Sequence, residues 1–228
     1  MIIAEYIFIC LFAYLLGAIP SGLLVSRWMG KVDITQYGSG NIGGTNVIRT
    51  VGLSAGIIVI VCDLGKAIIS VLLARFVIGD NILTVAGTGF YYTLAQILAA
   101  CCAMLGHSFS IYIKFRGGKS VAVYYGTLFI IFPLAVAVGA VILIPTVIIS
   151  RQMSRASILS TIGIIVFFMV MTAVYHLPPM YLIYSILGTI FIIIRHHENI
   201  LRLQSGTELK LDWDKIFKRL HKDTKQRP

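Results

Sequence analysis

Residues 120–149 read SVAVYYGTLFIIFPLAVAVGAVILIPTVII, an apolar stretch without a charged side chain. One membrane-crossing helix needs about 20 such residues, so the stretch is too long for one crossing and short for two. Basic residues flank both of its ends, with Lys119 before it and Arg151 after it. Because Lys and Arg collect on the cytoplasmic side of membrane proteins, both ends belong on that side. The stretch therefore predicts two short helices that turn near Pro133, with one tilted crossing and a misplaced loop as the simpler alternative.

The other apolar runs extend this interpretation to the whole chain. They cover residues 2–26, 51–78, 82–105, 156–175 and 180–194. Hydrophobic residues make up 58% of the chain and charged residues 12%, whereas soluble domains are near one half apolar and one quarter charged. This composition excludes a water-soluble fold, a disordered chain and a disulfide-rich scaffold. We expect an all-α, polytopic integral membrane helix bundle of about seven transmembrane helices, two of them short, in a membrane domain of residues 1–209.

The positive charges lie in a few connections and in the tail. The formal net charge is +10, from 19 Lys and Arg against 9 Asp and Glu. The connections near 79–81 and 177–179 contain no Lys or Arg, unlike those at 114–119 and 151–155. The positive-inside rule thus predicts that the N-terminus lies outside and that the C-terminus and the basic loops are cytoplasmic. Residues 210–228 are expected to form a basic cytoplasmic tail, either an amphipathic helix on anionic lipid or a solvated chain.

Asp63 and Lys66 are charged residues inside an apolar run. Side chains three residues apart share one face of a helix. Because an unpaired charge is costly inside a bilayer, we expect the two to neutralise each other there.

The first polar segment on the predicted cytoplasmic side is 38–49, GSGNIGGTNVIR. It contains a formal GxGxxG pattern, but a dinucleotide-binding fingerprint requires a preceding strand and a βαβ unit, whereas this segment follows a membrane span. Its glycines still expose backbone N–H groups that bind phosphate, and its arginine adds a bidentate partner for phosphate oxygens. The candidate binding residues are Ser39, Gly40, Asn41, Gly43, Thr45, Asn46 and Arg49. A polar reverse turn with capping residues is the alternative.

The second polar segment, 106–120, ends in Gly-Gly-Lys-Ser, like the close of a Walker A loop. The first glycine of that motif would fall at Ile113, and no βαβ frame surrounds the segment, which argues against an ATPase. Two glycines beside a lysine still form a cradle for an anion. The candidates here are His107, Gly117, Gly118 and Lys119. A positive-inside loop that caps the next helix is the alternative.

The third polar segment is 195–203, RHHENILRL, where the last apolar run ends. His196 and Asn199 lie three residues apart and share a helix face. Adjacent histidines point apart on a helix, and no other segment completes a set of metal ligands. We therefore favour a histidine that binds phosphate or transfers a proton over a histidine that binds a metal ion. A smaller basic connection adds the hydroxyls of Ser154 and Ser157 at helical spacing.

Together these segments present glycine nests, cations, hydroxyls and a histidine on one side of the membrane. Such groups bind phosphate, so they indicate a phosphorylated substrate and, because of the membrane setting, a lipid-like partner. The alternative function is a small transporter or flippase for a phosphorylated solute or lipid. Transport sites lie near the bilayer midplane, so the one-sided placement counts against it. No metal, no cofactor and no nucleic-acid partner is expected.

At these residues the chain resembles the PlsY-type family of acyl-phosphate-dependent glycerol-3-phosphate acyltransferases of bacterial inner membranes. The resemblance covers nearly the whole chain and rests on the three polar segments, the last of them His196-x-x-Asn199-Ile200-x-Arg202-Leu203 followed by Gly206 and Glu208. The sequence departs from the family pattern at Gly44, Ser110 and Ser120, where the family usually has Ala, Pro and Gly.

The resemblance implies an enzyme that transfers a fatty acyl group from a long-chain acyl phosphate to the 1-hydroxyl of sn-glycerol 3-phosphate. The products would be lysophosphatidic acid and phosphate, in the first acylation of phospholipid synthesis. The residues implied to hold the phosphate of glycerol 3-phosphate are Ser39 and the catalytic residues Arg49, Lys119, His196 and Asn199. The 38–46 segment, with Thr45 and Asn46, would hold the acyl phosphate head, and Ser154 or Ser157 would complete the polar wall. The acyl chain would lie between apolar helices, and the base would be His196 or a substrate phosphate oxygen.

Overall fold

The computed structural model describes residues 2–78, 90–214 and 216. These residues form helices and connections without a β-strand, and they contain one isolated bridge, between Ser110 and Arg116. The helices are α1 Ile2–Ala18, α2 Ser21–Gly30, α3 Gly44–Thr50, α4 Leu53–Ile78, α5 Phe90–Ser108, α6 Val121–Ile131, α7 Pro133–Ser150, α8 Met153–Tyr175, α9 Pro179–Arg195 and α10 His197–Gln204. Two short 3-10 helices, η1 and η3, span Ile34–Gln36 and Ile111–Ile113. The predicted all-α fold is confirmed.

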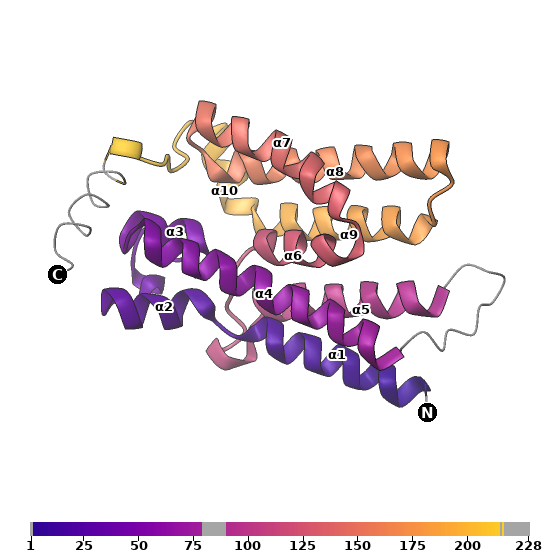
Figure 1. The fold of residues 1–228 in the computed structure, drawn as a ribbon. Helices are drawn as coiled ribbons and strands as arrows, with labels where there is room; N and C mark the ends of the chain where they lie inside the picture. Colours follow the sequence, from indigo (N-terminus) through magenta and orange to yellow (C-terminus); the bar gives the residue numbers. More distant parts are fainter. Residues whose placement is uncertain (1, 79–89, 215, 217–228) are drawn as a thin grey trace, which may run out of the picture.

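The long helices lie side by side in two groups (Figure 1). Helices α1, α4 and α5 contact one another, and α8 packs between α7 and α9. Helix α6 contacts both α4 and α7 and so joins the groups. The main apolar core forms around α6, where Tyr124, Leu128, Phe168 and Tyr184 are fully buried. The N-terminus lies at one end of the bundle, whereas α2, α3 and α10 lie toward the other end, where the polar segments meet (Figure 1).

The outer surface of the bundle is apolar. Phe76, Val141 and Ile149 expose 84%, 73% and 83% of their surface. Such side chains favour aggregation in water, whereas a bilayer solvates them. The segments long and apolar enough to cross a membrane are Ile2–Gly30, Leu53–Ile78, Pro133–Ser150 and Met153–Tyr175, and α9 with α10, bent by 65°, would be a fifth. The chain is an integral membrane helix bundle, while the predicted count of seven spans is not confirmed.

The 120–149 stretch turns where the sequence predicts. Helix α6 ends after 11 residues, and α7 begins at Pro133. Proline suits the first turn of a helix because the N–H group that it lacks would have no partner there. In Figure 1, α7 runs back along the bundle from the end of α6. The turn is confirmed, and of the two helices α6 is short, while α7 with 18 residues is long enough for a full crossing. Residues 82–89 of the apolar run at 82–105 lie outside the described chain.

The first apolar run breaks into two helices. The predicted span over 2–26 lies within the candidate span Ile2–Gly30, but its helix is interrupted at residues 19–20, between α1 and α2. Pro20 causes the break because it has no N–H group for the helical hydrogen bond and disfavours the helical conformation at Ile19. The Ile19 carbonyl accepts a hydrogen bond from the Lys66 ammonium, with 2.9 Å between Nζ and O. The break therefore supplies an acceptor for a charge inside the bundle.

The start of the predicted tail packs against the bundle. Leu211 and Ile216 are 2% and 6% exposed, and they share an apolar cluster with Ile48 of α3 and Ala156 of α8. The boundary predicted between residues 209 and 210 stays a prediction. The predicted amphipathic tail helix falls mostly on residues 215 and 217–228, which lie outside the described chain, so it also stays a prediction.

Candidate active site

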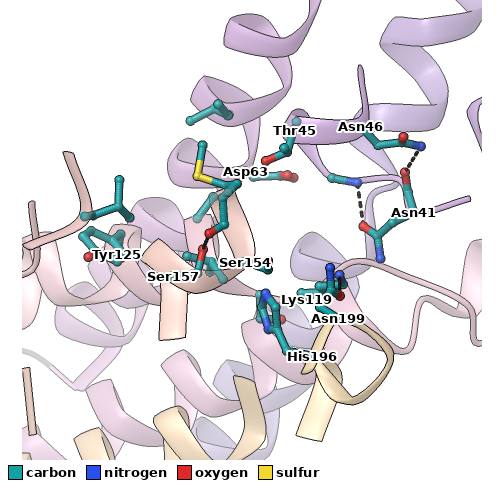
Figure 2. Close-up of a pocket in the computed structure, with 18 of the residues that line it drawn as sticks. Asn41, Thr45, Asn46, Asp63, Lys119, Tyr125, Ser154, Ser157, His196 and Asn199 are labelled. Atoms are coloured by element: carbon teal, nitrogen blue, oxygen red, sulfur yellow. Dashed lines mark hydrogen bonds between the residues drawn. The ribbon is translucent and has the colours of Figure 1, made fainter. Parts of the chain in front are cut away.

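A cavity of about 370 Å³ lies where the polar segments meet. Residues from the segment before α3 and from α3, α4, α6, α7, α8 and α10 border it (Figure 2). Twelve of the predicted site residues line this cavity: Ser39, Asn41, Gly43, Thr45, Asn46, Arg49, His107, Lys119, Ser154, Ser157, His196 and Asn199. Segments far apart in the sequence therefore converge on one site.

Asn46 holds the glycine segment in shape. Its amide Nδ2 donates to the carbonyl groups of Tyr37 and Asn41, at 2.9 Å each, and its Oδ1 accepts from the N–H of Ser39 at 3.0 Å. Gly38 has a φ of 60°, which favours glycine, and a Cβ there would overlap the Asn46 Oδ1. Asn46 is 2% exposed, so its hydrogen-bonding groups serve the loop. Asn46 thus organises the backbone that is expected to bind a phosphate.

Lys119 and Asn199 meet on one wall of the cavity, where Lys119 Nζ donates a hydrogen bond to Asn199 Oδ1. Figure 2 shows the two side chains beside His196, with Thr45 on the opposite side of the cavity. Burial lowers the pKa of Lys119 to about 8, against the opposing effect of the Glu208 charge. Lys119 is therefore an ammonium at neutral pH and titrates just above it.

His196 lies between α9 and α10 and borders the cavity. Its Nδ1 is 2.8 Å from the Ile192 carbonyl oxygen, which can only accept, so Nδ1 carries the proton of the neutral ring. The lone pair is then on Nε2. Burial and the neighbouring Lys119 charge lower the pKa of His196 to about 4. The ring is therefore neutral at physiological pH and can accept a proton or a hydrogen bond at Nε2.

Arg49 reaches the cavity from the last turn of α3. Its Nη2 donates to the Leu209 carbonyl at 2.9 Å, so a backbone group fixes one edge of the guanidinium. Guanidinium groups pair bidentately with phosphate oxygens. Arg49 and Lys119 together bring two positive charges to the polar end of the cavity.

Glu208 also lines the cavity, although residue spacing gives no reason to include it. Its Oε1 accepts from Ser154 Oγ at 2.8 Å and from Asn199 Nδ2 at 2.6 Å, and its Oε2 accepts from Arg202 Nε at 2.9 Å. Burial raises the pKa of Glu208, but these hydrogen bonds outweigh burial and hold the pKa below its usual value. Glu208 is thus a carboxylate that orients Asn199 and Ser154. The family resemblance of the third segment is the signal that identifies it.

Gly117 and Gly118 do not line this cavity. The Gly118 N–H donates to the His107 carbonyl at 3.0 Å, and a Cβ on Gly118 would overlap the His107 ring. Both glycine carbonyls accept from the Arg195 guanidinium, at 3.3 to 3.4 Å. The glycines therefore permit close packing against the end of α5, and their role in substrate binding stays a prediction. Gly40 lines a neighbouring, mostly polar cavity of about 380 Å³.

The predicted ion pair between Asp63 and Lys66 forms, with Oδ1 and Nζ 2.9 Å apart. Lys66 Nζ also lies 3.0 Å from His107 Nδ1 and donates to the Ile19 carbonyl. The contacts with Ile19 and His107 are hydrogen bonds, whereas the contact with Asp63 is an ion pair, and Asp63 Oδ1 accepts no hydrogen bond from the residues that the structure describes. Both charged side chains are at most 5% exposed, and Asp63 borders the cavity. Pairing of opposite charges is what allows ions to be buried in a membrane bundle.

The remaining wall of the cavity is apolar. It consists of side chains from α4, α6, α7 and α8: Ile60, Leu64, Val121, Ala122, Tyr125, Ala140, Leu143, Ile144 and Met153. One cavity therefore combines a cationic, hydrogen-bonding end with a surface suited to a hydrocarbon chain. Within the described ranges, no group of three or more His, Cys, Asp or Glu residues could hold a metal ion.

Comparison with known proteins adds to this geometry. The family model for glycerol-3-phosphate acyltransferase matches residues 7–206. The chain belongs to the glycerol-3-phosphate acyltransferase family. The protein named glycerol-3-phosphate acyltransferase 3 of Dehalococcoides mccartyi is 38% identical, over 93% of this chain and 98% of its own length. The glycerol-3-phosphate acyltransferase of Symbiobacterium thermophilum is 34% identical, over 91% of this chain and 96% of its own.

Two crystal structures of PlsY, described as an integral membrane glycerol 3-phosphate acyltransferase, share the fold of this family member. The glycerol 3-phosphate form matches with a TM-score of 0.78 and the lysophosphatidic acid form with 0.76. The sequences are 31% identical, and the match covers 93% of this chain and 98% of PlsY. The family resemblance of the three polar segments is confirmed.

Proposed function

We propose that this membrane enzyme transfers a fatty acyl group from an acyl phosphate to the 1-hydroxyl of glycerol 3-phosphate, releasing lysophosphatidic acid and inorganic phosphate. Membership of an acyltransferase family supports the reaction class. The observation that carries the proposal is the single cavity that joins Arg49 and Lys119 to an apolar wall. A phosphorylated polar substrate fits the first part, and an acyl chain fits the second.

The two anionic substrates would use different groups at the polar end. Arg49 and Lys119 supply the charge that offsets the phosphate dianion of glycerol 3-phosphate, with Asn199 and Ser39 as hydrogen-bonding partners. The head of the acyl phosphate would lie against segment 38–46, on N–H groups other than those of Ser39, Gly40 and Gly43, which already donate within the segment. In this proposal the acyl carbonyl group would lie next to the glycerol hydroxyls.

Transfer forms a bond from the 1-hydroxyl oxygen to the acyl carbonyl carbon and breaks the bond from that carbon to the phosphate oxygen. Phosphate is a good leaving group, so orientation of the substrates and neutralisation of their charges lower the barrier most. The hydroxyl proton goes to His196 Nε2, which holds the lone pair because Nδ1 donates to Ile192, or to an oxygen of a substrate phosphate. Ser154 and Asn199, both held by Glu208, would border the reacting groups.

The positive charges support one orientation in a bacterial inner membrane. The N-terminus would lie outside, and the C-terminus and the loops that border the cavity would be cytoplasmic. Glycerol 3-phosphate would then arrive from the cytoplasm and the acyl phosphate from the bilayer.

The test is a transfer assay with purified protein in lipid. Palmitoyl phosphate and labelled glycerol 3-phosphate should give labelled lysophosphatidic acid, and palmitoyl-CoA should not replace the acyl phosphate. No acylated product with either donor would refute the reaction. His196→Ala and Arg49→Ala should each lower turnover at least about tenfold, whereas His176→Ala, an exposed histidine between α8 and α9, should not. Unchanged turnover in both site variants with saturating substrates would show that the assigned roles are wrong.

A further inference from the structure

Residues 207–211 form a segment, here called the C-terminal strap, that crosses from α10 to the connection between α7 and α8. The Leu211 N–H donates to the carbonyl of Arg151, the residue after α7, at 2.7 Å. The Leu211 side chain is 2% exposed and lies in one apolar cluster with Ile48 of α3 and Ala156 of α8. Leu211 therefore anchors the strap to helices on both sides of the cavity.

The strap holds groups of the proposed phosphate site. The Leu209 carbonyl accepts from Arg49 Nη2 at 2.9 Å. The Glu208 carboxylate accepts from Asn199 Nδ2 at 2.6 Å and from Ser154 Oγ at 2.8 Å. The Glu208 side chain is 1% exposed, so water does not compete for these bonds. The strap thus fixes the directions in which Arg49 and Asn199 present their N–H groups.

The acyl phosphate end of the cavity is organised separately. Asn46 fixes the glycine segment through hydrogen bonds that stay within residues 34–46. Loss of the strap's hydrogen bonds would therefore disturb Arg49 and Asn199 directly, whereas the hydrogen bonds of Asn46 that shape the glycine segment, which also carries Ser39, do not involve the strap.

Resting on the function proposed above, we propose that Leu211 is a positioning residue for the binding of glycerol 3-phosphate. It does not border the cavity and acts through Glu208 and the Leu209 carbonyl, which keep Arg49 and Asn199 in the geometry that binds the phosphate. Leu211 also lies beyond residues 7–206, which the family model matches.

Steady-state kinetics of the full chain in lipid test this role, with palmitoyl phosphate and glycerol 3-phosphate as substrates. Leu211→Ala should raise the KM for glycerol 3-phosphate about tenfold, the effect of misaligning one charge-assisted hydrogen bond, and change the KM for palmitoyl phosphate less than about twofold. Leu211→Met, which keeps most of the buried volume, should restore the wild-type value. The matched control is Ile9→Ala, which removes as many carbon atoms from a fully buried side chain of α1 and should leave both KM values unchanged.

A purely packing role gives a different result. Lower thermal stability of Leu211→Ala with both KM values unchanged would overturn the proposal, and so would an equal rise of both KM values. If Leu211→Ala does not fold, Leu211→Val removes less of the side chain and should show the same split with a smaller rise. A wild-type protein that transfers no acyl group would refute the proposed function and the role of Leu211 with it. An active wild-type enzyme with Leu211 variants whose KM for glycerol 3-phosphate does not change would refute only the role of Leu211.

Discussion

Raising the pH should weaken the use of glycerol 3-phosphate, because Lys119 loses its charge close to the physiological range. Burial lowers the pKa of Lys119 to about 8, while the Glu208 charge raises it and the Arg202 charge lowers it further. The ammonium is therefore present below pH 8 and disappears above it. A phosphate monoester is a dianion above about pH 6. The phosphate dianion and the Lys119 ammonium are thus present together only between about pH 6 and about pH 8.

The expected size of the effect follows from the pKa. One unit above it, about one tenth of Lys119 molecules are protonated, so kcat/KM for glycerol 3-phosphate should fall about tenfold per pH unit there. His196, with a pKa of about 4, does not titrate in this range. In Lys119→Arg the guanidinium stays charged throughout. This variant should be less active at neutral pH but should lack the fall near pH 8.

The assay measures initial rates of labelled lysophosphatidic acid formation from about pH 6.5 to about pH 10, with palmitoyl phosphate saturating and glycerol 3-phosphate far below its KM. Spontaneous hydrolysis of palmitoyl phosphate is measured without enzyme at each pH and subtracted. The reasoning about Lys119 fails if the wild-type profile stays level across this range. It also fails if Lys119→Arg loses activity at the same pH as the wild type.

Two further predictions concern packing and buried charge. Gly118→Ala should lower kcat/KM for glycerol 3-phosphate at least about tenfold because its Cβ would overlap the His107 ring, whereas Gly65→Ala, with nothing within 4 Å, should keep the wild-type rate. Lys66→Met should destabilise the bundle by about 3–5 kcal/mol because the Asp63 carboxylate stays buried without its partner, and adding Asp63→Asn should recover most of that loss in thermal unfolding in detergent. Equal unfolding midpoints for the single and double variants would contradict the pairing.

Much of the chemistry of the site can be predicted from the sequence. Polar residues such as Ser39, Arg49 and His196 are conspicuous in a chain of apolar runs, because a membrane protein keeps such groups only where they are used or paired. The Asp63–Lys66 pair and the turn before α7 are also predictable. The ion pair follows from the three-residue spacing on one helix, and the turn follows from the effect of Pro133 on the residues next to it. Both effects act within a few residues, so the local sequence is enough to predict them.

The features that could not be predicted depend on which segments meet. The role of Glu208 depends on its hydrogen-bond donors, Ser154 in α8 and Asn199 in α10. No periodicity within one helix connects these two residues to Glu208. Gly117 and Gly118 show a second difficulty, because glycine serves an exposed anion nest and a tight backbone contact equally well. The structure shows a tight contact, because a Cβ on Gly118 would overlap the His107 ring and one on Gly117 the carbonyl oxygens of His107 and Ser108, while a role in substrate binding stays a prediction. The break at Pro20, by contrast, is signalled by the proline and by Ser21 and Gly22 after it, although the run is apolar enough overall to predict one span.

The pairing of Lys66 has a consequence for how α1, α4 and α5 are held together. Its partners belong to α4 itself, to α5 and to the break that follows α1. A bilayer supplies no water to replace these partners, so each of them is costly to lose. The Lys66 ammonium therefore cross-links the break after α1 and the end of α5 to the middle of α4, three places that are far apart in the sequence.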